Sequence, residues 1–253
     1  MEMGSVRAIV ADLDPDLVGT LPAVRLEPAR SASVAAVITV QPGEWDTHAE
    51  ADQARGGYGL LVLDGLLVRE ATVSNHPCAE LLGPGDLLRA GDDNDTEVLL
   101  PRRIEWAAAT SARVAIVDQA LAVRMAQWPE IFAALMDRAA RRAERLVVTQ
   151  AIAHLTRVDD RLLALLWLLA ERWGRVVPGG VLVSLRLPHR TLAGMVGARR
   201  PSVTTALGQL MARGAIERRS DGAWILRGTP PSEDHIESQT TVAFAQQRVR
   251  IPG

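Results

Sequence analysis

Several features that would place this chain in a common class of protein are missing from its sequence. It has one cysteine, Cys78, which excludes an intramolecular disulfide framework and any iron–sulfur cluster held by thiolates of this chain alone. The longest apolar run, residues 162–170, has nine residues, about half of what a membrane-spanning helix requires. Asp12, Asp14 and Asp16 lie where a signal peptide would need its apolar segment. These absences predict a soluble, cytoplasmic protein that makes no contact with a membrane.

Lysine is also missing, so all 28 basic side chains are arginine. They are unevenly distributed: residues 1–120 contain 9 Arg and 19 Asp or Glu (net −10), whereas residues 121–253 contain 19 Arg and 11 Asp or Glu (net +8). Residues 186–228 alone have a net charge of +6. An acidic half joined to a basic half predicts that only the second half meets a polyanion.

Residues 187–214 are typical of two short helices joined by a tight turn. The first helix is expected at about residues 190–196, and Gly197 after it can take a positive φ without steric cost. The second helix is expected to open at Pro201, whose fixed φ suits the first helical position. Val203, Leu207 and Leu210 then form one apolar stripe.

The other side of the second helix is polar. It carries Ser202, Thr205 and Gln209, and two arginines, Arg199 and Arg200, stand at its entrance. A buried face opposite a short polar face with arginines at the N-terminal tip suits a helix laid in the DNA major groove. The alternative is an ordinary helical hairpin within a helical domain.

The residues after this pair of helices favour the DNA-binding interpretation. Residues 215–219 and 223–227 are short apolar and basic strands around Ser220-Asp221-Gly222, in which Asp-Gly is a dipeptide typical of hairpin turns. Helix, turn, helix and hairpin make a winged helix, predicted over residues 158–228. The hairpin also carries Arg218 and Arg219, which are available for phosphate contact.

The N-terminal half predicts a different architecture. Short strands separated by turn residues are expected at residues 34–40, 58–63 (with 66–69 as its hairpin partner), 103–108 and 113–117. Gly83-Pro84-Gly85-Asp86 is a strong turn. Strands this short indicate an antiparallel β-roll or barrel over residues 1–118, and the sequence has no phosphate-cradling glycine loop.

Between the two halves the period changes to that of a helix, and residues 119–157 are predicted to form a linker and a long dimerisation helix. The helix starts at Pro129 and runs to about Leu155. Arginines 138, 141, 142 and 145 lie off its apolar seam. The seam residues, which we expect to pair two copies of the chain, are Phe132, Met136, Ala139, Ala143, Leu146, Gln150 and Ala153. The alternative is packing of the seam against the chain's own β-domain.

Two further expectations complete the chain. Asp159 is placed to cap the next helix, which runs to about Trp173. Residues 229–253 are rich in Pro, Ser, Thr and Gln, which predicts a largely disordered tail.

This order of parts resembles the Crp/Fnr family of bacterial transcription regulators over residues ~30–228. In the first half the likeness rests on residues 58–65 (YGLLVLDG) and 82–86 (LGPGD). In the second it rests on Asp160-Arg161-Leu162, on Leu192-Ala193, and on Val196-Gly197 before Arg200 and Val203. Residues 161–176 and 197–207 are similar to an actinobacterial branch of the family. The resemblance implies an α+β fold: a cyclic-nucleotide-binding-like jelly roll, a long dimerisation helix and a C-terminal winged helix-turn-helix.

The resemblance also implies roles for single residues. Arg200 matches the recognition-helix arginine that reads guanine, and Ser202 matches a phosphate contact. The glutamate that usually follows the arginine is Pro201 here, and the second base-reading arginine is Thr205. The DNA site is therefore not expected to be the family's best-known palindrome.

The sensory half departs from the cyclic-nucleotide binders of the family. Their Gly-Glu-Leu and Arg-Ser/Thr-Ala steps are replaced by residues 87–97 (LLRAGDDNDTE), whose acids would repel a phosphate. The helix positions that meet adenine fall near Leu146 and Val147, which cannot hydrogen-bond a base. We therefore expect an effector other than cAMP or cGMP, or no effector at all.

Other chemistries find little support in the sequence. The run Asp92-Asp93-Asn94-Asp95 lacks the ligand spacing of a calcium loop, and His76 with Cys78 lacks a second axial ligand for haem. No catalytic constellation is recognisable, so we expect no enzyme activity, metal or cofactor. The predicted function is a homodimeric regulator that reads a palindrome in double-stranded DNA, with RNA polymerase as a candidate partner. The alternative is constitutive DNA binding by a protein whose β-roll is a protein-interaction module.

Overall fold

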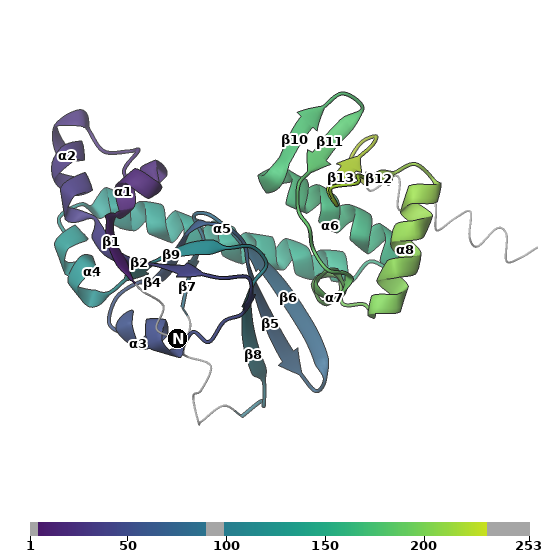
Figure 1. The fold of residues 1–253 in the computed structure, drawn as a ribbon, viewed down its shortest axis with the longest axis horizontal. Helices are drawn as coiled ribbons and strands as arrows, with labels where there is room; N and C mark the ends of the chain where they lie inside the picture. The colour runs from purple at the N-terminus through teal and green to yellow at the C-terminus, as the bar shows by residue number, and fades with distance from the viewer. Residues whose placement is uncertain (1–4, 90–98, 232–253) are drawn as a thin grey trace, which may run out of the picture. The chain divides into compact units, whose positions relative to one another are not determined.

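The computed structural model describes residues 5–89 and 99–231. Its contacts divide the chain into two units, Met1–Val148 and Thr149–Gly253, which are described separately (Figure 1). The acidic run Asp92-Asp93-Asn94-Asp95, and nearly all of the tail expected at residues 229–253, lie outside the described residues. Among the helices of the described part, none is long and apolar enough to cross a membrane.

The first unit contains two antiparallel sheets, which confirms the predicted N-terminal β-roll. One sheet has the strand order β1-β2-β9-β4-β7 and the other has the order β3-β8-β5-β6. The strands of the first sheet are Val6–Ile9 (β1), Val34–Val40 (β2), Ala112–Val117 (β9), Gly59–Asp64 (β4) and Leu87–Leu88 (β7). Those of the second are Gly43–Glu44 (β3), Arg103–Ala108 (β8), Leu67–Val73 (β5) and His76–Leu82 (β6).

The hairpin expected between residues 58–63 and 66–69 is wrong, because β4 and β5 belong to different sheets. β4 pairs with β9 and β7, whereas β5 pairs with β6 and β8. The Asp64-Gly65 step is a corner where the chain crosses from one sheet to the other. Gly65 has φ +81°, and a Cβ there would lie 2.2 Å from the carbonyl oxygen of Ser111. Glycine at this position therefore permits a close approach of two backbones rather than a two-residue turn.

β4 is buried on both faces, which explains its unbroken apolar run. Leu60 and Val62 belong to the core between the sheets, which also contains Trp106. Leu61 and Leu63 belong to a second core. That second core includes Ile131, near the start of the long helix. A strand covered on both sides loses the alternation that a half-exposed strand shows.

The first unit also contains helices that we did not predict. They are Val10–Leu13 (α1), Pro15–Leu17 (η1, a 3₁₀ turn), Ala23–Ala32 (α2), His48–Gln53 (α3) and Gln119–Met125 (α4). Most are one or two turns long, and α2 shows little amphipathic pattern because Val24 and Leu26 are exposed. A 3.6-residue period cannot be recognised in elements of this kind.

The long helix is α5, Pro129–Ala153, close to the predicted span. Ile131, Leu135 and Arg138 are buried on the side that faces the roll. Phe132, Met136 and Leu146, on another side, are 45%, 40% and 43% exposed.

The second unit is a helical domain with a four-stranded sheet of order β10-β11-β13-β12. Its helices are Val158–Trp173 (α6), His189–Met195 (α7) and Arg200–Ala212 (α8). Its strands are Gly174–Val177 (β10), Gly180–Val183 (β11), Ile216–Arg218 (β12) and Trp224–Leu226 (β13). This confirms the predicted helix–turn–helix followed by a hairpin.

One local expectation in this unit is wrong: Asp159 does not cap α6, which begins at Val158 with Arg157 as its N-cap residue. The hairpin loop consists of the three residues predicted between the strands, Ser220-Asp221-Gly222, and the Arg219 N–H donates to the Ala223 carbonyl at 2.9 Å across it. Gly222 has φ +84°, as expected of the left-handed residue that closes such a loop.

Candidate nucleic-acid interface

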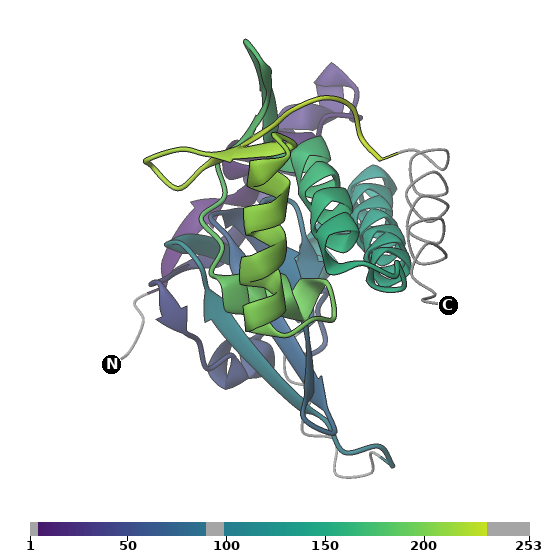
Figure 2. The ribbon, with the colours of Figure 1, turned by 90° about the vertical axis from the view of Figure 1, so that its right-hand side faces the viewer.

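The helix–turn–helix is built from two helices whose apolar faces are fully buried. α7 ends where the Ala198 N–H donates to the Ala193 carbonyl at 2.9 Å. Gly197 in this turn has the expected positive φ, +60°. Val203, Leu207 and Leu210 of α8 are at most 2% exposed. The residues on the other side of α8 are exposed. Figure 2 shows the backbone of this helix, in yellow-green, nearest the viewer.

The candidate base-reading residues lie on this outward side. Arg199 is the N-cap residue of α8, with an extended backbone (φ −87°, ψ 147°), and α8 begins at Arg200, one residue before the predicted start. The outward residues, all exposed, are Arg199, Arg200, Ser202, Thr205 and Gln209. The Thr205 hydroxyl donates to the Pro201 carbonyl at 3.2 Å, so its oxygen keeps acceptor capacity.

An open groove runs along part of this surface. Its lining residues are Val158, Asp159, Pro201, Ser202, Thr205, Ala206 and Gln209. The structure thus brings three of the five predicted α8 residues together, namely Ser202, Thr205 and Gln209. Their spacing of three and four residues places them on one helix face.

The two predicted hairpin arginines differ in their surroundings. The guanidinium carbon of Arg218, on β12, lies 5.2 Å from the centroid of the Trp224 ring. Arg219, in the loop, lies 3.4 Å from the Asp221 carboxylate (Nε to Oδ2). Both side chains are exposed, but Arg219 shares its charge with a carboxylate, whereas Arg218 rests on an aromatic face.

Asp159 supports α8 from α6, a role that the sequence did not reveal. Its carboxylate accepts hydrogen bonds from Arg157 at 3.0 and 3.1 Å and from Arg213 at 3.1 Å. Burial by itself would raise the pKa of Asp159, but the hydrogen bond from Arg157 and the charges of Arg157 and Arg213 lower it. For Asp160, burial and the neighbouring Asp159 raise the pKa.

Arg161 ties the turn of the motif to α6. It donates to the carbonyls of Leu155 at 2.6 Å, Val196 at 3.2 Å and Gly197 at 3.3 Å. Carbonyls at the ends of helices have no partner within the helix, and a guanidinium satisfies several of them at once. Together with the fully buried Leu162, this gives the Asp160-Arg161-Leu162 motif a structural role.

His189 and Thr204 were also missed by the sequence reasoning. Nδ1 of His189, the first residue of α7, lies 2.9 Å from the hydroxyl oxygen of Thr204 on α8. Burial, followed by the charges of Arg218 and Arg200, lowers the pKa of His189. A histidine directly after Pro188, at the start of the first helix of the motif, is the only sequence feature that points to it.

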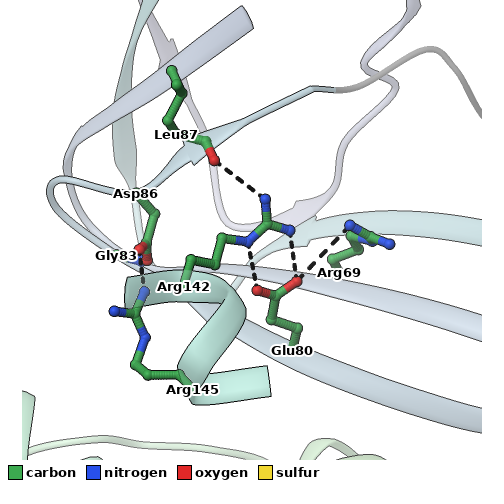
Figure 3. A network of polar contacts seen from close by, with 7 residues as sticks. All are labelled: Arg69, Glu80, Gly83, Asp86, Leu87, Arg142 and Arg145. Carbon is green, nitrogen blue, oxygen red and sulfur yellow. Dashed lines mark hydrogen bonds and ion pairs between the residues drawn. The ribbon is translucent and has the colours of Figure 1, made fainter. Parts of the chain in front are cut away.

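A second set of contacts joins α5 to the roll (Figure 3). Arg142 donates to both carboxylate oxygens of Glu80, at 2.6 and 2.8 Å, and to the Leu87 carbonyl at 3.2 Å. The hydrogen bond to Glu80 raises the pKa of Arg142. Arg69 on β5 lies 3.9 Å from the same carboxylate. Glu80 on β6 thus holds two arginines from different elements.

Two neighbouring arginines of α5 repeat this arrangement. Arg145 pairs with Asp86, which is 1% exposed and also accepts from the Gly83 N–H at 2.8 Å. Arg138 forms a two-point pair with Asp14, one of whose contacts is 2.9 Å. The turn predicted at residues 83–86 therefore supplies a carboxylate to α5.

At about 100° per residue, the predicted dimer seam lies roughly a quarter-turn around α5 from these arginines. Phe132, Met136, Ala143, Leu146 and Gln150 are exposed, and Ala139 and Ala153 are half-buried. Phe132 touches the roll through Tyr58, with ring centroids 5.6 Å apart. The structure thus leaves most of the seam uncovered by the chain's own β-domain.

Within the described ranges 5–89 and 99–231, no group of three or more His, Cys, Asp or Glu is placed to hold a metal ion.

Comparison with known domains assigns the helix–turn–helix. The family model of the Crp-like helix-turn-helix domain matches residues 160–227, which include α7, α8 and both hairpin strands. The chain has a Crp-like helix-turn-helix domain on the fold of the Crp/Fnr family. This confirms the resemblance predicted from the sequence. No curated protein matches the sequence.

Solved structures of the Crp/Fnr family share the fold over most of the chain. TTHB099 of Thermus thermophilus, a transcriptional regulator of the CRP family, is 19% identical with a TM-score of 0.54 and covers 80% of this chain and 96% of its own. CLP of Xanthomonas campestris is 18% identical with a TM-score of 0.54, and the match covers 82% of this chain and 100% of CLP. FixK2 of Bradyrhizobium japonicum is 18% identical with a TM-score of 0.51, and the match covers 81% of this chain and 96% of FixK2.

Proposed function

We propose that this protein is a sequence-specific transcription regulator that binds a palindromic site in double-stranded DNA as a homodimer. Its two α8 helices would enter successive major grooves at half-sites ~34 Å apart. The observation that carries this proposal is the exposed polar face of α8, opposite the fully buried Val203–Leu207–Leu210 stripe, within a Crp-like helix-turn-helix domain.

The exposed residues divide into two roles. Arg199, Arg200, Thr205 and Gln209 read base edges, and the arginine fork of Arg200 suits guanine O6 and N7. The residues that hold phosphates are Ser202, Arg218 and Arg219. Arg218 is the better placed of the two hairpin arginines, because Arg219 already faces Asp221.

The exposed seam supports dimerisation through α5. A helix with Phe132, Met136 and Leu146 each at least 40% exposed leaves apolar area in water. Burial of such area against a second copy is favourable by ~25 cal/mol per Å². The small side chains Ala139 and Ala143 would let the two helices approach closely.

The effector of this regulator, if it has one, is not cAMP. Leu146 and Val147 offer no hydrogen bond to a base, and Arg142 and Arg145 of α5 are already paired with Glu80 and Asp86. CLP is a c-di-GMP-responsive regulator, which makes dinucleotides a class to test.

One observation favours the alternative in which the roll needs no small molecule. Arg138, Arg142 and Arg145 already satisfy Asp14, Glu80 and Asp86 within the chain. In that case DNA binding is constitutive and the roll serves as a protein-interaction module. RNA polymerase is a candidate partner in either case.

Genomic selection of DNA fragments by the purified protein tests the function. At a stated salt concentration, because phosphate contacts make affinity salt-dependent, we expect enrichment of one palindromic motif bound by one dimer. Recovery of random fragments would refute sequence-specific binding. Repeating the affinity measurement with a panel of nucleotides, including c-di-GMP, and metabolites separates the two versions: a change in affinity with one of them favours a small-molecule effector, and no change with any of them favours constitutive binding.

A further inference from the structure

His189 stands where three elements of the DNA-binding unit meet. It opens α7, its Nδ1 lies 2.9 Å from the Thr204 hydroxyl on α8, and the charges that act on it come from Arg200 of α8 and Arg218 of β12. Arg200 and Arg218 are the residues we propose for reading a base and holding a phosphate. His189 is half-buried, so part of it remains accessible.

The hydrogen bonds fix which ring nitrogen is available. The Thr204 hydroxyl donates to the Arg200 carbonyl at 3.2 Å, so its oxygen accepts from the Nδ1–H of His189. Nε2 is then the nitrogen without a proton in the neutral ring. A proton added to the ring goes to Nε2 and creates a second N–H donor.

In the protein without DNA, the surroundings disfavour this proton. Burial disfavours the charged ring, and Arg218 and Arg200 repel it, so the pKa of His189 is below its ordinary value of 6.5. Arg190, the next residue on the same helix, adds a further positive charge in the sequence. The ring is therefore neutral at pH 7.

We propose that His189 is a proton-linked phosphate contact, which takes up a proton at Nε2 when the surface between Arg200 and Arg218 meets the DNA backbone. A phosphate placed there offsets the repulsion by the two arginines and accepts a hydrogen bond from the new N–H. This inference rests on the proposed function, because it requires that α8 and the hairpin face DNA.

The sign of the pH effect is set by this proton. DNA raises the pKa of His189, so binding takes up a proton, and affinity increases as pH falls through the pKa of the complex. The pH dependence of the affinity is greatest at pH values between the pKa of His189 in the free protein and its pKa in the complex. Within that interval each proton taken up changes the binding constant by up to about tenfold per pH unit.

The test compares pH profiles of DNA affinity. Fluorescence anisotropy with the selected duplex and with a scrambled duplex of equal length, from pH 5.5 to 8 at constant ionic strength, gives the slope of log Kd against pH. We expect the wild-type protein to show the same slope of log Kd against pH on both duplexes, because phosphate contacts are independent of sequence. His189→Gln, which cannot take up a proton, should lose this slope, and His189→Arg, which carries a permanent charge, should bind tightly at pH 8 and show no slope.

A matched control and a direct measurement complete the test. His48→Gln, at an exposed histidine of α3 in the other unit, should keep the wild-type slope. The pKa of His189, followed by NMR of its ring proton, should rise when DNA is added. A His189→Gln protein with the wild-type slope, or a pKa of His189 that does not rise with DNA, would overturn the inference.

These outcomes are distinct from failure of the proposed function. A wild-type protein that binds neither duplex at any pH refutes the regulator. A protein that binds DNA with a pH slope independent of His189 refutes only the proton-linked contact.

Discussion

The carboxylate of Asp159, near the start of α6, accepts a hydrogen bond from Arg213, the residue that ends α8, with 3.1 Å between Oδ2 and Nη1. Asp159 is 4% exposed and holds Arg157 with the same carboxylate. The C-terminal end of α8 is thus fixed to α6 by a charge that is almost fully removed from water. This contact adds to the buried apolar face in holding the proposed recognition helix.

Asp159→Asn should destabilise the second unit. The change removes the charge that Arg157 and Arg213 share and leaves only Asp160, 3.8 Å from each guanidinium group, to pair with them, at a cost of about 1–3 kcal/mol. Native-state hydrogen exchange of the α8 amides measures this stability without interference from the other unit.

Asp160→Asn is the matched control, one residue further along α6. Burial and the charge of Asp159 raise the pKa of Asp160, so its ionised form is disfavoured and its removal should cost no stability. The ionised carboxylate of Asp159 has the opposite effect on stability, because its pKa is lowered in the folded protein. Its contribution to stability is present above the unfolded pKa of ~3.9 and is lost as pH falls through the folded pKa. Equal losses from the two variants at pH 7 would contradict this assignment.

Glu80→Gln and Arg142→Met should each destabilise the roll, because each leaves one side of a mostly buried two-point pair without its partner. Their side chains are 14% and 15% exposed. A loss of about 3 kcal/mol for a single variant is typical of such pairs. In a double-mutant cycle of urea unfolding, the coupling energy should be ~1–3 kcal/mol. Asp52 and Arg55, whose pair is 71% and 82% exposed, provide a control cycle that should show no measurable coupling.

Arg200→Ala and the double change Arg218→Ala with Arg219→Ala should weaken DNA binding in different ways. Loss of Arg200 removes a base contact and should relax preference at one base-pair position per half-site, by ~1–3 kcal/mol. Loss of the hairpin arginines should weaken binding to all DNA sequences by a similar factor. It should also reduce the slope of log affinity against log salt concentration by about one per lost contact. Selection and salt titration of both variants distinguish the two effects, and a uniform loss for Arg200→Ala would argue against base reading.

Leu146→Asp should dissociate the dimer. The charge falls on an exposed apolar position of the seam, where it costs little in the single chain but would be buried in the pair. Sedimentation velocity should show a monomer with weakened DNA affinity. Val123→Asp, at an exposed apolar residue of α4 outside the seam, should remain a dimer; a dimeric Leu146→Asp protein would place the interface elsewhere.

The sequence was sufficient where structure depends on near neighbours. The period of α5, the Pro201 start and Gly197 turn of α8, and the strand at residues 34–40 are all local patterns, and each was found within a residue or two. The buried stripe of α8 was also correct, because spacing on a helix determines which side chains share a face.

Residues whose roles depend on distant partners were misassigned. Gly65 was interpreted as a hairpin turn because its approach to Ser111 cannot be seen from neighbouring residues. Asp159 was interpreted as a cap because its partner Arg213 lies 54 residues away. His189 gained meaning only when the fold placed it beside Thr204 on the next helix. Tertiary contacts of this kind override local preference, and one sequence does not contain their geometry.

Arg138, Arg142 and Arg145 lie at intervals of four and three residues along α5, and their carboxylates come from three separate segments of the roll. One residue of an α-helix corresponds to about 100° of rotation. Any rotation of α5 about its own axis would therefore break all three ion pairs together. The predicted dimer seam is consequently held at one angle about the axis of α5, so a second copy that pairs with it would meet it already oriented.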